Sequence, residues 1–220
     1  MVNRPNNAER YPILGRVLLF LMGCAFILAL VAPLTLRRPG AWSNFALGTI
    51  TSLGTIALSI LFVRWDGLRL EDVGVVFRVG SLLRLALGLL IGLLLVAVKS
   101  GVAGYLGHVR WAQESGIRLG QAAIVFCSYL ALALREELAF RGYPLRRLES
   151  PFGLWGAQLI VAAAFALEHV AGGLSWMHAF LGAGVGSLLF GMAALATRDL
   201  TMPIGLHAAW NFGSWMFGEK

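Results

Sequence analysis

Long apolar segments separated by short polar loops run through almost the whole chain, and they restrict what it can fold into. A helix needs about 20 residues to cross the hydrocarbon core of a bilayer. The candidate segments are residues 13–32, 41–63, 82–98, 119–142, 152–170, 174–196 and 204–217. We therefore predict an all-α protein, a polytopic transmembrane bundle of about seven helices, or eight if a long loop holds a re-entrant helix.

The composition agrees with this class and excludes others. Apolar residues make up 58% of the chain and charged residues 13%, whereas soluble domains average about 25% charged. The net charge of +7 does not indicate nucleic-acid binding, because the arginines are scattered through the loops and form no basic tract. The expected partners are the lipid bilayer and a protein or peptide, with no nucleic acid.

The basic residues also predict an orientation through the positive-inside rule. With the N-terminus in the cytosol, 12 of the 18 Lys and Arg residues fall on the inner side and the other 6 on the outer side. This orientation places Glu136 and Glu137 near the cytosolic face. Because arginine greatly exceeds lysine, we interpret the chain as an integral protein of a bacterial cytoplasmic membrane.

Two adjacent acids, Glu136 and Glu137, continue an apolar helix segment. Ionisable residues in such a segment are candidates for function, because burying an unpaired charge costs several kcal/mol. At about 100° per residue, Glu137 shares a face with Arg141, which predicts an ion pair, whereas Glu136 points elsewhere and is free to react. The alternative is that both acids are merely solvated in the headgroup region.

Three more polar residues stand in apolar helices. His169 ends the fifth segment, and His207 and Asn211 lie four apart on the seventh, so they share a face. Each alone is explained by a hydrogen bond to a neighbouring helix. Together with Glu136 they form a set in which every polar group needs a partner where water is scarce, which favours a common site.

This set can hydrolyse an amide. A buried glutamate can take a proton from water, and an imidazole can orient that water or pass the proton to the leaving amine. A second histidine with an asparagine amide can donate to the developing oxyanion. Zinc is the other possibility, held by His169, His207 and a glutamate such as Glu136, although the HExxH pattern of common zinc proteases is absent.

In order and spacing, Glu136-Glu137-x-x-x-Arg141, Phe165-x-x-x-His169 and His207-x-x-x-Asn211 resemble the CAAX protease and bacteriocin-processing family of intramembrane proteases, which includes the type II CAAX prenyl endopeptidases. The resemblance implies an intramembrane endopeptidase in which Glu136 and His169 activate water. It implies that His207 and Asn211 stabilise the oxyanion, with Glu137 and Arg141 in support, and it leaves open whether zinc is used.

On this basis residues 119–217 are the expected catalytic region, and residues 1–118 hold N-terminal transmembrane helices and loops of the same membrane domain. The eukaryotic branch of the family implies a lipid-modified peptide substrate. Glu168, directly before His169, lies outside the family pattern and is either a loop acid or a substitute ligand. Two other functions stay open: a non-catalytic immunity or scaffold protein of the same fold, and a proton or metal transporter.

Overall fold

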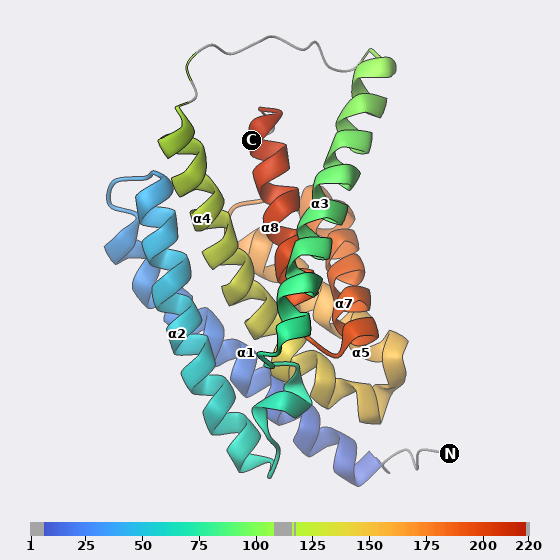
Figure 1. Ribbon diagram of the computed structural model, residues 1–220. Helices are drawn as coiled ribbons and strands as arrows, with labels where there is room; N and C mark the ends of the chain where they lie inside the picture. Colours follow the sequence, from blue (N-terminus) through green and yellow to red (C-terminus); the bar gives the residue numbers. More distant parts are fainter. Residues whose placement is uncertain (1–6, 108–115, 117, 219–220) are drawn as a thin grey trace.

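The computed structural model describes residues 7–107, 116 and 118–218, and these residues form helices joined by short loops (Figure 1). In chain order the α-helices and the short 3₁₀ and π segments (η) are α1 (Asn7–Thr35), α2 (Ala41–Trp65), η1 (Leu70–Val73), α3 (Val79–Tyr105), α4 (Leu119–Glu137), η2 (Leu138–Gly142), α5 (Tyr143–Ala171), α6 (Trp176–His178), η3 (Ala179–Gly184), α7 (Val185–Thr197) and α8 (Thr201–Met216). The predicted helix bundle is confirmed, and the chain is an integral membrane protein.

The division into spans differs in part from the prediction. Among the described residues, five helical stretches are long and apolar enough to cross a membrane: Arg10–Thr35, Ala41–Trp65, Val79–Tyr105, Leu119–Ala171 and Trp176–Thr197. The predicted fourth and fifth segments belong to one of these stretches. The predicted seventh corresponds to α8, whose 16 residues are fewer than a perpendicular crossing needs.

The helix that carries Glu136 breaks at Gly142, as the sequence predicted. The chain passes from α4 through the π segment η2, and Gly142 has non-helical dihedral angles (φ −72°, ψ −116°) before α5 begins at Tyr143. Pro144 is accommodated because it occupies the first turn of α5, where its missing N–H is not needed. A second break lies within α5, at Gly153, whose φ of 71° lies in the left-handed region that glycine tolerates.

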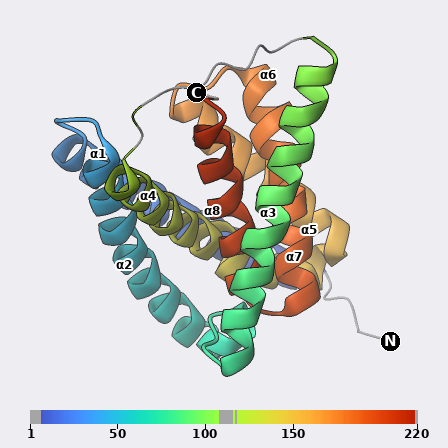
Figure 2. The ribbon, with the colours of Figure 1, turned by 45° about the horizontal axis from the view of Figure 1, so that its top comes forward.

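Helix α8 packs closely along α3, and the two run side by side in both ribbon views (Figures 1 and 2). Glycines make the close approach possible. A Cβ on Gly88 would overlap the carbonyl oxygen of Met202, and one on Gly205 would overlap that of Leu85. In membranes such small residues allow backbones to meet where larger side chains would separate them. The α3 contact therefore fixes the height and rotation of α8.

Replacing Gly205 by alanine should push α8 away from α3. We expect a loss of about 1–3 kcal/mol in the free energy of unfolding, the usual cost of overpacking. The measurement is reversible unfolding of the purified protein in mixed micelles. Gly101→Ala is the matched control, since a Cβ at Gly101 in α3 meets nothing within 4 Å. Equal stability of the two variants would contradict this account of the α3–α8 contact.

Asp199 holds the start of α8 in place. Its buried carboxylate accepts hydrogen bonds from Ser81 Oγ at 2.7 Å and Arg84 Nη1 at 2.9 Å, both on α3, and from Thr201 N at 2.7 Å. Burial alone would raise the pKa of this carboxyl, but the hydrogen bonds outweigh burial and the pKa is lowered. Asp199 is therefore a charged anchor between the turn before α8 and the first turn of α3.

Candidate active site

A cavity of about 560 Å³ lies between the end of α4, the end of α5, α7 and α8. The four residues expected to be catalytic all line it: Glu136 from α4, His169 from α5, and His207 and Asn211 from α8. Most of the remaining lining is apolar, including Phe165, Leu189 and Phe190. Side chains from three separate stretches of sequence thus meet in one hollow within the bundle.

Both adjacent glutamates face His207, one at each ring nitrogen. Nδ1 lies 2.8 Å from Glu137 Oε1, and because a carboxylate accepts, the ring donates from Nδ1. Nε2 lies 3.6 Å from Glu136 Oε2. Glu136 Oε2 is buried and has no hydrogen-bond partner among the described residues. One acid therefore orients the imidazole, while the other presents an unpartnered oxygen to the cavity.

Arg141 balances the charge of Glu137 beneath the cavity. Its Nη1 lies 3.3 Å from Glu137 Oε1, and both side chains are fully buried, so this is the i,i+4 pair that the helical spacing predicts. The guanidinium also lies over the rings of Phe165 and Phe190, at 4.4 and 5.4 Å from their centroids. These contacts compensate part of the desolvation of the arginine.

His169 is oriented by its own helix. Its Nδ1 lies 2.9 Å from the carbonyl oxygen of Phe165, one turn earlier. A carbonyl can only accept, so Nδ1 carries the proton and a neutral ring keeps a lone pair on Nε2. The Phe165-x-x-x-His169 spacing thus fixes the tautomer and packs the imidazole on the Phe165 ring, with 4.4 Å between centroids.

The site contains contacts that the sequence reasoning missed. Phe190 stacks on His207 with 4.3 Å between ring centroids and an angle of 15°. His178, on the short α6, also lines the cavity. Glu168 pairs with Arg135, whose Nη1 and Nη2 both lie 2.6 Å from Glu168 Oε1. In the sequence, the only indication of this pair is that Arg135 directly precedes Glu136 and Glu168 directly precedes His169.

Glu136, His169 and His207 were the predicted zinc ligands. Among the residues that the structure describes, no three His, Cys, Asp or Glu side chains are arranged to hold a metal ion. The Phe165 carbonyl and Glu137 accept from Nδ1 of His169 and His207, which leaves Nε2 of each ring outside these two contacts. Histidines that bind a metal commonly donate their other ring N–H in this way, so the Nδ1 contacts themselves are compatible with a metal.

Residues 118–213 match the family model described as type II CAAX prenyl endopeptidase Rce1-like. This segment is an Rce1-like domain. It runs from the residue before α4 into α8, so it contains every residue of the candidate site, and the resemblance seen in the sequence is confirmed. Comparisons with curated proteins and with solved structures found no match.

Proposed function

We propose that the protein is an intramembrane endopeptidase that hydrolyses a peptide bond near the cytosolic membrane face. The observation that carries the proposal is the convergence of Glu136, His169, His207 and Asn211 on one cavity of the Rce1-like domain. The twelve basic residues on the inner side support an N-terminus in the cytosol. The excess of arginine over lysine supports a bacterial cytoplasmic membrane as the location.

In the proposed reaction, Glu136 takes a proton from a water molecule while the water oxygen attacks the scissile carbonyl carbon. The unpartnered Oε2 of Glu136 supports this role, because a base needs a free oxygen toward the cavity. His169, fixed with its proton on Nδ1, offers the Nε2 lone pair to the second hydrogen of the same water. Both groups therefore hold the nucleophile from different helices.

The carbonyl oxygen gains negative charge as the water adds. We assign the side-chain amide of Asn211 and Nε2 of His207 as its hydrogen-bond donors, the latter when the ring carries both protons. Glu137 holds the His207 ring by Nδ1, which directs Nε2 into the cavity. When the intermediate collapses, the C–N bond breaks and Glu136 returns the proton to the leaving amine.

Hydrolysis can be tested without knowing the substrate. Membranes containing the protein are incubated in heavy-oxygen water, and peptides are searched by mass spectrometry for new carboxyl termini that carry the label. Labelled termini that depend on the protein support the proposal, and an unmodified or lipid-modified terminus identifies the substrate class. Label patterns identical to those of membranes without the protein would favour the non-catalytic immunity or scaffold function.

We further propose that the reaction proceeds without a bound metal. In the described part of the chain, no three His, Cys, Asp or Glu side chains are arranged to hold a metal ion, which supports a glutamate-dependent mechanism. Prolonged treatment with a strong zinc chelator should leave activity within about twofold of the untreated protein, since no metal-bound water is needed. Activity that disappears on chelation and returns with zinc would overturn this expectation.

A further inference from the structure

An ion pair joins the residues that directly precede two motifs of the site. Arg135 comes before Glu136 on α4, and Glu168 comes before His169 on α5. The guanidinium places two nitrogens 2.6 Å from one carboxylate oxygen, and the side chains are only 5% and 17% exposed. This is a charge-assisted contact with little solvent, and not a surface salt bridge of negligible effect.

The pair lies where α4 and α5 have few other contacts. In the described residues η2 joins the end of α4 to the start of α5 and packs against α5, for example through Phe140 and Phe165, whereas direct packing between α4 and α5 is sparse. Each partner sits on a helical backbone one residue from a proposed catalytic group. The Arg135–Glu168 contact is therefore a direct link between α4 and the end of α5, beside the packing of Phe165 on Phe140.

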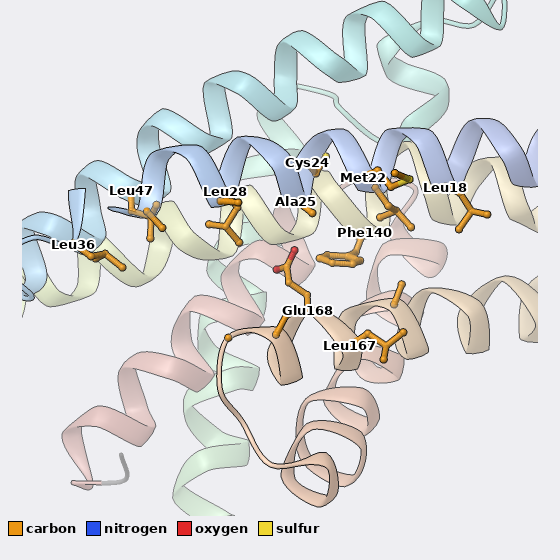
Figure 3. Close-up of a pocket in the computed structure, with 16 residues that line it drawn as sticks. Leu18, Met22, Cys24, Ala25, Leu28, Leu36, Leu47, Phe140, Leu167 and Glu168 are labelled. Atoms are coloured by element: carbon orange, nitrogen blue, oxygen red, sulfur yellow. The ribbon is translucent and has the colours of Figure 1, made fainter. Parts of the chain in front are cut away.

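The pair also stands between two cavities. Glu168 lines an apolar cavity of about 750 Å³ between α1 and α5, and Figure 3 shows its carboxylate beside Phe140, turned toward that side. Glu136 and His169 line the other cavity, which is the candidate active site. An arginine without Glu168 would face this apolar space unpaired, and the nearest alternative acid along its helix is Glu136.

On the basis of the proposed function, we propose that Arg135 and Glu168 are positioning residues for the hydrolysis. Their ion pair fixes His169 against Glu136, and Glu168 holds the Arg135 guanidinium away from the Glu136 carboxylate, which leaves that oxygen available to water. Neither residue belongs to the motifs that carry the resemblance to the family.

The test is a cycle of Glu168→Gln, Arg135→Gln and the double variant, assayed on a synthetic peptide that carries the junction found by heavy-oxygen labelling. We expect Glu168→Gln to lower kcat about tenfold with little change in KM, because the unpaired Arg135 turns to Glu136. The kcat of the double variant should be at least about threefold higher than that of Glu168→Gln, since no free guanidinium is left. Glu149→Gln, which removes the same kind of charge from the pairs with Arg198 and Arg146, is the matched control.

A second readout does not depend on activity. With ¹⁵N-labelled histidine in micelles, the His169 signal, assigned by its loss in His169→Asn, should shift in Glu168→Gln and stay unchanged in Glu149→Gln. Wild-type kcat in Glu168→Gln, strictly additive losses, or an unmoved His169 signal would each overturn the positioning role. If the wild-type protein cleaves nothing, the proposed function fails, and the histidine spectra still decide whether the pair holds His169.

Discussion

Glu136→Gln should abolish peptide cleavage while leaving the protein folded and in the membrane. The substitution keeps the shape of the side chain and removes the group that accepts the proton from water. General-base catalysis contributes about 10²–10⁴-fold, so kcat should fall by at least about a hundredfold. The measurement is the rate of labelled carboxyl termini in heavy-oxygen water, with purified protein in vesicles and the peptide identified in membranes.

The control for this variant is Glu71→Gln, the same chemical change in a half-exposed acid that pairs with Arg69 and Arg78 far from the cavity. Its activity and unfolding midpoint should match those of the wild type. Glu136→Gln should share that midpoint, because Glu136 Oε2 makes no hydrogen bond that folding relies on. Full activity in Glu136→Gln would refute the mechanism.

The sequence predicted the helices and the meeting of the motifs for the same physical reason. Apolar segments of spanning length must form helices in a bilayer, and polar groups within them must converge to be satisfied. Helical spacing alone predicted that Glu137 pairs with Arg141 and that His207 and Asn211 share a face. These are local properties, fixed by about 100° per residue, and they do not depend on how distant helices pack.

The sequence was less informative where contacts between distant parts of the chain determine the local structure. Gly142 and Pro144 are ordinary stop signals and the helix does break at Gly142, but the π segment η2 that precedes this break was not predicted. The anchoring of α8 at Asp199, which accepts from Ser81 and Arg84 of α3, is a contact that no periodicity reveals. Glu168 looked like a loop acid or a ligand because its partner, Arg135, lies 33 positions earlier on another helix.

Glu137→Leu should strongly destabilise the protein. It would leave Arg141, which is fully buried, without its carboxylate, and removing one partner of a buried ion pair costs about 3–5 kcal/mol. The loss would appear as a lower free energy of unfolding in mixed micelles. Arg141→Met should cost a similar amount, because it strands Glu137.

The double variant Glu137→Leu/Arg141→Met separates stability from chemistry. Replacing both charges by apolar groups removes the stranded charge, so much of the unfolding free energy should return. Cleavage should not return, because His207 has lost the acceptor that holds Nδ1 at 2.8 Å and its ring is no longer directed into the cavity. A double variant that regains stability and activity together would show that Glu137 serves only the fold. One that regains stability alone means that the same carboxylate has two roles. It neutralises Arg141, as the helical spacing predicted, and it orients the imidazole of His207.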